Sequence, residues 1–376
     1  MITKFFSDEL QKTGNRIAQT KSSSKILLDK NEQALDVDAV LKMKLMQSLM
    51  DTNWNRYPTA DYSSIEAKTA AYCNLNPENI LLGNGSASII TTLLNYFAIN
   101  KKKITIAQPS YSLFDYHCKT YNIEYEPWFL NADLEFDYEN MPVLDKDSVF
   151  IITSPNNPVG NTLDLDKLEQ LLELYPDSCI ILDNVYSEFC STNYTPLINK
   201  YQNLIILRSF SKAFPIAGLR LGYLCSSAPT VSLIRKLMLQ FSINPLSLTF
   251  ANEILFDENF MASSGQRVTE IINQRELLRA SISNQYSNEL LTVYPSEGNF
   301  LLIRIHDDKI FENLMEDLNQ EGIRVLNTSA FALMKNSFRV SIGTSSENKT
   351  FLQCFNDNMQ SNLLTIQWLS SLSKTG

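Results

Sequence analysis

Short apolar runs alternate with amphipathic stretches from about residue 78 to residue 214. Each apolar run is four to six residues long and reads as a buried strand, and three amphipathic stretches of ten to fifteen residues read as helices. This alternation is typical of βαβ units and predicts a mostly parallel sheet. The segments that carry the pattern are 78–99 (strand, glycine turn, helix), 102–122 (strand, proline turn, helix), 148–161 (strand and turn), 164–175 (helix), 179–189 (strand) and 203–214 (strand).

Beyond about residue 230 the pattern changes to long helical stretches and a few separate strands. Residues 264–287 have helical periodicity, 297–305 and 338–343 read as strands, and a helix is expected near 309–321. We therefore predict an α/β fold with two domains. The large domain spans 31–245, and a smaller α+β domain combines 246–376 with an amino-terminal arm of residues 1–30.

Composition and charge narrow the class of protein. The chain has 376 residues, a formal charge of −9 and no basic stretch, which argues against a nucleic-acid partner. Six cysteines without a CxxC pair, and only two histidines, predict a reduced cytoplasmic protein without a bound metal. No apolar run approaches the roughly 20 residues that span a bilayer, so we expect a soluble protein with no membrane partner.

One lysine lies in an unusual setting, the segment SFSKAFPIAGLRLGY at 209–223. A lysine ammonium at the end of a strand, partly removed from water, can lose its proton and form an imine with an aldehyde. Pyridoxal phosphate is the cofactor that uses this chemistry. It also requires anion donors for its phosphate, an acid near its ring nitrogen and donors near its phenolic oxygen.

The sequence has a candidate for each requirement, at or just after the end of an apolar strand. Ligands of parallel sheets bind there, beyond the carboxyl ends of the strands. The glycine turn GNGSAS (83–88) opens a helix, whose free N–H groups favour an anion. The candidates are Arg220, Ser209 and Ser211 for the phosphate, Asp183 for the ring nitrogen, Asn157 and Tyr186 for the phenolic oxygen, and Tyr111 as a ring-stacking partner.

Each candidate also has a purely structural interpretation. Taken alone, Lys212 reads as a solvated surface lysine, Asp183 as a turn or helix-cap residue and Arg220 as a member of an ion pair. Tyr111 and Tyr186 read as core aromatic residues whose hydroxyl groups reach water, and Asn157 reads as part of a turn. The order of these residues and their joint occurrence at strand ends favour the functional interpretation.

Several motifs of the chain together resemble those of a known family. The lysine segment resembles the signature of class I/II pyridoxal-phosphate aminotransferases. The full set of motifs is similar to the histidinol-phosphate aminotransferase branch, in order from about Asn31 to Gly343. The resemblance implies a fold-type I architecture, a homodimer and an active site shared between subunits. The matching motifs are NRYP (55–58), ILLGNGS (80–86), PSYS (109–112), SPNNPVG (154–160), LDNVYSEF (182–189) and FRVSIG (338–343).

The resemblance also implies residue roles. Lys212 would form the imine and shuttle the proton, and Asp183 would contact the ring nitrogen. The phosphate would be held by Ser209, Ser211, Arg220 and the amides of Gly85, Ser86 and Ala87, with Tyr57 reaching it from the other subunit. Asn157 and Tyr186 would contact the phenolic oxygen, Tyr111 would stack on the ring, Arg339 would hold the substrate's anionic group, and Asn31 and Glu32 would begin the substrate segment.

The chain departs from the family pattern around the substrate. The family usually continues from Asn-Glu into Asn-Pro-Tyr-Gly, whereas residues 33–36 read QALD here. Ala87 and Ser88 replace the usual acidic pair. A second family arginine falls at Leu326, with Arg324 two positions away. These departures argue against histidinol phosphate as the substrate, whereas the residues expected to bind the cofactor are all present.

The resulting prediction is an aminotransferase. It would move an amino group between a donor, which is histidinol phosphate or an aromatic or other amino acid, and a 2-oxo acid, in two half-reactions. One alternative is a pyridoxal-phosphate lyase resembling threonine-phosphate decarboxylase, which would release CO2 or ammonia without an acceptor. The other is a non-enzymatic sensor, against which the presence of both Lys212 and Asp183 argues.

Overall fold

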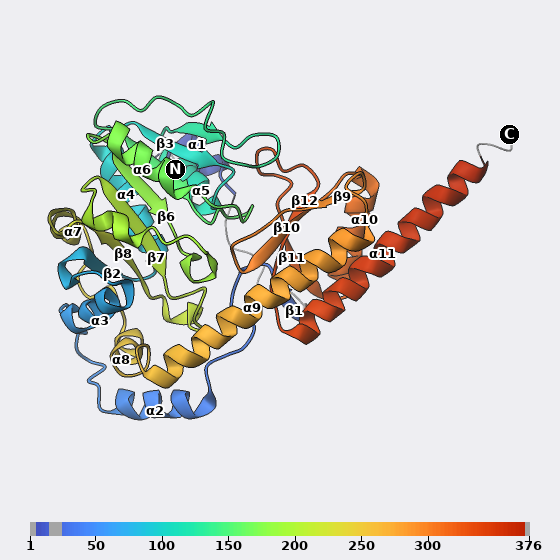
Figure 1. Ribbon diagram of the computed structural model, residues 1–376. Helices are drawn as coiled ribbons and strands as arrows, with labels where there is room; N and C mark the ends of the chain where they lie inside the picture. Colours follow the sequence, from blue (N-terminus) through green and yellow to red (C-terminus); the bar gives the residue numbers. More distant parts are fainter. Residues whose placement is uncertain (1–4, 15–24, 373–376) are drawn as a thin grey trace.

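The computed structural model describes residues 5–14 and 25–372, and its largest feature is a seven-stranded sheet (Figure 1). Neighbouring strands pair in parallel except β8, which runs antiparallel to β2 and to β7. The predicted α/β architecture with a mostly parallel sheet is therefore confirmed. The strand order across the sheet is β2 (Ile80–Gly83), β8 (Gly222–Ser226), β7 (Leu204–Ser209), β6 (Cys179–Asp183), β5 (Val149–Thr153), β3 (Ile104–Gln108) and β4 (Glu126–Phe129).

The helices of this part of the chain follow from local sequence. In α6 (Leu165–Leu174), the Asp164 side chain accepts a hydrogen bond from the main-chain N–H of Lys167 and caps the first turn. Its three buried leucines are spaced at three and four residues, so they lie on one face. The other helices here are α1 (Asp8–Lys12), α2 (Ala39–Met50), α3 (Ser63–Cys73), α4 (Ser86–Ile99), α5 (Ser112–Tyr121), α7 (Ala228–Arg235) and α8 (Pro245–Glu253).

A second, five-stranded sheet is built from both ends of the chain. Its order is β1 (Ile26–Leu28), β11 (Ile323–Asn327), β12 (Ser337–Ser341), β10 (Phe300–Ile305) and β9 (Leu291–Val293). β1 pairs in parallel with β11, and the remaining pairs are antiparallel. Helix α10 (Asp308–Gln320) lies beside α11 (Ser345–Leu372), and α9 (Glu258–Gln285) runs from the large-sheet side to the small sheet (Figure 1).

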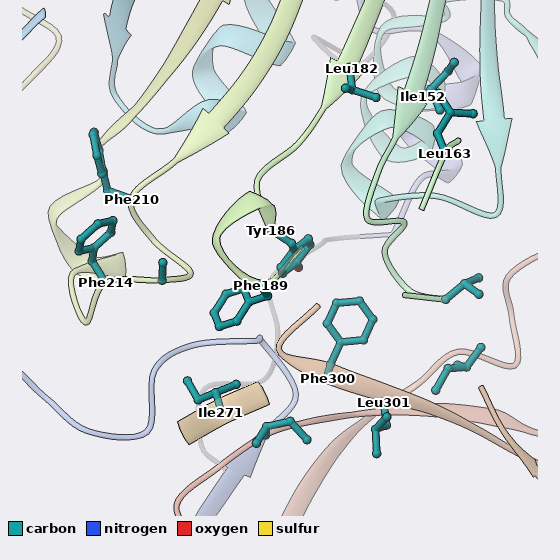
Figure 2. Close-up of a cluster of buried hydrophobic side chains, with 14 of the residues drawn as sticks. Ile152, Leu163, Leu182, Tyr186, Phe189, Phe210, Phe214, Ile271, Phe300 and Leu301 are labelled. Atoms are coloured by element: carbon teal, nitrogen blue, oxygen red, sulfur yellow. The ribbon is translucent and has the colours of Figure 1, made fainter. Parts of the chain in front are cut away.

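A shared hydrophobic core joins the two sheets. Tyr186, which follows β6, packs edge-on against Phe300 of β10 with ring centroids 5.2 Å apart, and Figure 2 shows this pair within the cluster. Ile271 of α9 belongs to the same cluster. Full burial of each such side chain stabilises the fold by about 1.5–3 kcal/mol. Tyr186, three residues after the end of β6, is thus one of the contacts through which the core joins the two sheets.

The amino-terminal segments lie in two places. Strand β1 extends the small sheet, while α1 lies beside α5 of the large sheet. The parts of the predicted arm at residues 1–4 and 15–24, and the end of the predicted small domain at 373–376, lie outside the described residues, and the predicted domain boundaries remain a prediction. No helix within 5–14 or 25–372 is both long enough and apolar enough to cross a membrane.

Candidate active site

A cavity of about 530 Å³ opens at the carboxyl ends of three neighbouring parallel strands. The last residues of β5, β6 and β7, which are Thr153, Asp183 and Ser209, all line it. Because these strands are adjacent and parallel, their ends meet at one edge of the sheet. Residues of the small sheet, Leu326 of β11 and Arg339 of β12, line the cavity as well.

Asp183 is a buried acid with an unused acceptor. Its side chain is 1% exposed, and its Oδ1 atom has no hydrogen-bond partner. Burial raises the pKa of Asp183 to about 7, although the main-chain N–H of Val185 and the ammonium of Lys212 lower it. Leaving a buried carboxylate oxygen unpaired is costly, so this atom is suited to accept a proton donor from a bound group.

Lys212 follows β7 and lies half-buried in the same cavity. Its Nζ atom donates a hydrogen bond to the main-chain oxygen of Lys30 at 3.0 Å. Burial and, to a smaller extent, the Arg339 guanidinium lower the pKa of Lys212 to about 8, although the Glu32 carboxylate opposes the change. A neutral, nucleophilic amine is therefore accessible near physiological pH.

Two glycines bring the start of α4 close to β8. Gly85 has a φ of 76°, a conformation that side-chain-bearing residues seldom adopt, and a Cβ there would lie 2.8 Å from Nη2 of Arg220. A Cβ on Gly222 would lie 2.4 Å from the main-chain nitrogen of Ser86. The guanidinium of Arg220 and the first amides of α4 consequently lie close together, and N–H donors grouped in this way at a helix start suit an anion.

Ser209 and Ser211 add two hydroxyl groups to the cavity. Both are buried and both line it, and the Ser209 hydroxyl accepts a hydrogen bond from the main-chain N–H of Ser211 at 3.1 Å. This contact fixes the turn that leads from β7 to Lys212.

Arg339 of β12 lines the cavity from the small sheet. It is 5% exposed, and its guanidinium donates to Oδ1 of Asn157 and to the main-chain oxygen of Asp29. The guanidinium lies over the Phe300 ring, 5.3 Å from its centroid. Its Nε atom is buried without a partner. The contacts on two sides hold this cation in one orientation facing the cavity.

Asn31 connects this wall to the residues after β6. Its Nδ2 donates to the Tyr186 hydroxyl at 2.9 Å, while its main-chain N–H and its Oδ1 both contact the Ser341 hydroxyl at 2.8 Å. Asn299 donates to its main-chain oxygen at 3.0 Å. Asn31 is fully buried, with a φ of 55°. It lies behind Tyr186 rather than at the cavity surface.

The structure brings most of the residues singled out from the sequence to this cavity. Three candidates lie next to the cavity without lining it. Gly85 and Ala87 flank the lining residue Ser86 at the start of α4, and Asn31 lies behind Tyr186. Tyr57 lies away from it, 83% exposed and stacked on Phe241 at 5.0 Å. Of the residues singled out as site candidates from the sequence, those that line the cavity are Glu32, Ser86, Tyr111, Asn157, Asp183, Tyr186, Ser209, Ser211, Lys212, Arg220 and Arg339.

Sequence reasoning missed several lining residues. Asp29 and Lys30 directly precede the recognised Asn31 and Glu32, so their position in the chain was an available signal. Thr153 ends an apolar strand, as Asp183 does, and the same rule could have found it. Phe331 lies in a loop between β11 and β12 and carries no comparable signal.

The donor set fits pyridoxal phosphate. The anion site at the start of α4 suits a phosphate, the unpartnered Oδ1 of Asp183 suits a protonated ring nitrogen, and Lys212 suits an aldehyde. Asn157 and Tyr186 add further polar atoms to the cavity lining. Among the described residues, no group of histidine, cysteine, aspartate and glutamate is arranged to hold a metal ion.

Comparisons with known proteins agree with this geometry. The family model "Aminotransferase class I and II" matches residues 23–355. A histidinol-phosphate aminotransferase of Pyrococcus furiosus is 30% identical over 89% of this chain and 92% of its own.

Solved structures share the fold. The histidinol-phosphate aminotransferase of Sinorhizobium meliloti, in complex with pyridoxal-5'-phosphate, has a TM-score of 0.74 at 19% identity and covers 90% of this chain and 92% of its own. An L-threonine-O-3-phosphate decarboxylase of Porphyromonas gingivalis also has a TM-score of 0.74 at 19% identity, with coverage of 89% and 99%.

The family match and the donor set confirm the cofactor expected from the sequence, pyridoxal phosphate. They also confirm the fold-type I architecture. The chain belongs to the family of class I and II aminotransferases.

Proposed function

We propose that the cavity transfers an amino group from a small donor to a 2-oxo acid, with Lys212 and Asp183 as its catalytic pair. The observation that carries this proposal is the meeting, in one cavity, of a lysine with a lowered pKa and a buried carboxylate with an unpartnered oxygen. Perturbed pKa values at two such groups in one cavity are typical of catalytic sites.

Each catalytic residue has a distinct task. Pyridoxal phosphate, when bound, supplies a ring that withdraws electrons and stabilises negative charge at the substrate's α-carbon. Nζ of Lys212 anchors the cofactor and then removes and returns the α-proton. Asp183 keeps the ring nitrogen protonated, because its buried carboxylate gains a partner only when a proton lies there.

The remaining residues bind and orient. Arg220, Ser209, Ser211 and the amides of Gly85, Ser86 and Ala87 hold the cofactor phosphate. Asn157 and Tyr186 contact the phenolic oxygen, with Tyr186 oriented by Asn31, and Tyr111 lies against the ring. Arg339 holds the anionic group of the substrate, supported by Asn157 and by the segment that leads to Glu32.

The test is a visible absorption spectrum of the protein incubated with pyridoxal phosphate, followed by titration with single amino donors. We would use histidinol phosphate, glutamate, phenylalanine and tyrosine, because relatives of this chain are named for the first. Loss of the bound-cofactor band with one donor, and its return with a 2-oxo acid, would support transfer. Lys212→Ala should abolish both changes, whereas Lys200→Ala, at an exposed surface lysine, should leave them intact.

A lyase is the competing activity, since a decarboxylase shares the fold. Radiolabelled CO2 or ammonia released in the absence of any 2-oxo acid, at the rate of substrate loss, would establish the lyase and overturn the transferase.

We also propose a homodimer in which Tyr57 enters the cavity of the other copy. Tyr57 is 83% exposed here, and exposed apolar side chains, among them Met43, Met46 and Met50, cover α2 just before it. Mixing Lys212→Ala with Tyr57→Ala chains tests this, because one site of each mixed dimer would be intact. About a quarter of the wild-type activity should return if chains pair at random as closed dimers, and none should return if each chain has a complete site.

A cytoplasmic location is proposed on the state of the cysteines. All six are free, and Cys73 and Cys225 lie close together without a disulfide. Fractionation of cells with an antibody against the chain tests this location.

A further inference from the structure

Asp29 contacts both arginines at the substrate end of the cavity, but with different atoms. Its main-chain oxygen accepts a hydrogen bond from Nη2 of Arg339. Its carboxylate forms an ion pair with Arg324, with Oδ2 and Nε 2.8 Å apart, but the Nε–H is not directed along this contact, so the pair is held by charge and not by a hydrogen bond. The two side chains of this pair are 15% and 26% exposed, so water screens the pair only in part. Substituting the side chain of Asp29 therefore leaves the main-chain contact with Arg339 in place, while it removes a carboxylate whose charge acts on both arginines and raises the pKa of Arg339.

The strand β11 places Arg324 and Leu326 on the same face, because side chains two positions apart in a strand point the same way. Leu326 lies directly opposite Arg339 in the β11–β12 register, and it lines the cavity. Side chains opposite each other on neighbouring strands approach within about 4.5–5.5 Å. The surface next to the Arg339 guanidinium is thus apolar, and Phe331 extends it. Arg324 is held to one side by Asp29.

We propose that Asp29 sets the substrate class of the site by neutralising Arg324 and keeping it away from the cavity. The site then accepts amino donors and oxo acids with one anionic group, which binds Arg339, and an uncharged remainder, which lies against Leu326 and Phe331. It discriminates against a second anionic group. This inference rests on the proposed transfer reaction.

The other charges at the mouth of the cavity agree with this assignment. Glu32 lines the cavity and repels a second anion, although its side chain is exposed and water weakens this repulsion. Lys30 also lines it, but its side chain is exposed, so water weakens its attraction for an anion. A dianionic substrate could recruit Arg324 only by breaking the ion pair, which would leave the Asp29 carboxylate half-buried with neither oxygen paired, since Oδ1 already lacks a partner.

The experiment compares glutamine with glutamate as donors, because the two have nearly the same shape and differ in one charge. Methionine serves as the apolar donor. The wild-type enzyme, loaded with pyridoxal phosphate, should have a higher kcat/KM for glutamine and methionine than for glutamate. Asp29→Asn should improve the glutamate-to-glutamine ratio by about tenfold, the effect of one added hydrogen bond between charged groups.

Whether the change in the glutamate-to-glutamine ratio lies in KM or in kcat shows whether it comes from substrate binding by Arg324. Because Asp29 acts through Arg324, the gain should lie in the KM for glutamate, with kcat nearly unchanged. Asp29→Asn combined with Arg324→Met should lose the gain, and Asp29→Glu should keep the wild-type preference. Asp308→Asn, which neutralises the aspartate of an exposed ion pair with Lys335 on the small domain side, is the matched control and should leave the ratio unchanged.

Three results would overturn the inference. They are a wild-type enzyme that prefers glutamate to glutamine, an Asp29→Asn enzyme that transfers amino groups with an unaltered ratio, or a gain that persists in the double variant. The first result decides the matter even if Asp29→Asn fails to fold. If no donor were converted at all while the cofactor band formed, the transfer reaction itself would be wrong.

Discussion

The Nζ atom of Lys212 donates its hydrogen bond to the main-chain oxygen of Lys30, 3.0 Å away. The lysine follows β7 of the large sheet, whereas Lys30 follows β1 of the small sheet. A neutral carbonyl holds the ammonium in place without stabilising it as an ion pair with a carboxylate would. The segment after β1 of the small sheet therefore holds the amine of Lys212 in position, and the amine remains easy to deprotonate.

The rate at which the apoprotein takes up pyridoxal phosphate should rise with pH and level off above a midpoint near the lysine pKa of about 8. Burial lowers this pKa, and only the neutral amine attacks an aldehyde, so uptake is slow below the midpoint and fast above it. Stopped-flow absorbance over a pH series measures the midpoint. Arg339→Leu should raise it, because a neighbouring positive charge is removed. A midpoint near the ordinary lysine value of 10.5 would contradict the assignment.

Asp183→Ala should reduce kcat by about 10²- to 10³-fold, the usual cost of removing one group that is oriented towards developing charge. The reason is that the ring nitrogen loses the buried carboxylate that keeps it protonated. Steady-state kinetics at saturating cofactor measure the effect, and the ratio of visible to protein absorbance confirms that the cofactor is still bound. A fully loaded variant with wild-type kcat would show that Asp183 is structural.

Gly222→Ala should destabilise the fold by about 1–3 kcal/mol and weaken cofactor binding, because the new methyl group would press on the main-chain nitrogen of Ser86 at 2.4 Å. Urea denaturation and cofactor titration measure the two effects. Gly265→Ala in the exposed middle of α9 is the control, since a methyl group there meets nothing within 4 Å. It should instead stabilise the protein by up to about 1 kcal/mol. Equal effects at both positions would refute the close-approach argument.

Glu188→Ala should cost about 3–5 kcal/mol of unfolding free energy, because it leaves the buried Arg208 without its counter-charge. The two side chains are 11% and 9% exposed and lie 3.1 Å apart. Asp177→Ala removes one partner of an exposed pair with Lys146 and should change stability by less than about 1 kcal/mol. Equilibrium unfolding of both variants gives the comparison, and similar losses would show that burial does not decide the effect.

The strands of the parallel sheet were predictable from their apolar runs. The expected segments at 148–161, 179–189 and 203–214 contain β5, β6 and β7, because a strand covered on both faces is apolar throughout. β6 and β7 end earlier than expected, at Asp183 and Ser209, where the apolar runs stop. Two strands were missed. Edge strand β4 is short and only its Trp128 is buried, and β8 begins at Gly222 and Tyr223, the last two residues of the lysine motif, so its start was read as part of that motif.

The site was predictable where its residues follow strands, and less so elsewhere. Asp183 and Ser209 could be found because each ends an apolar run. Asp29 could not be assigned a partner, since its contacts with Arg324 and Arg339 span about 300 residues of sequence and depend on the register of the small sheet. No local pattern encodes that register. The placement of Tyr57 by a second copy likewise stays a prediction.

The division of the cavity between two sheets has an evolutionary consequence. The residues assigned to the cofactor follow strands of the large sheet, whereas Asp29, Leu326 and Arg339 belong to the small sheet or extend directly from it. Asn31 is the hydrogen-bonded joint between the two groups. Mutations on β11 and β12 can therefore change which molecules enter while the chemistry is inherited intact. A chain built in this way can acquire a new metabolic role through a few substitutions on one side of its active site.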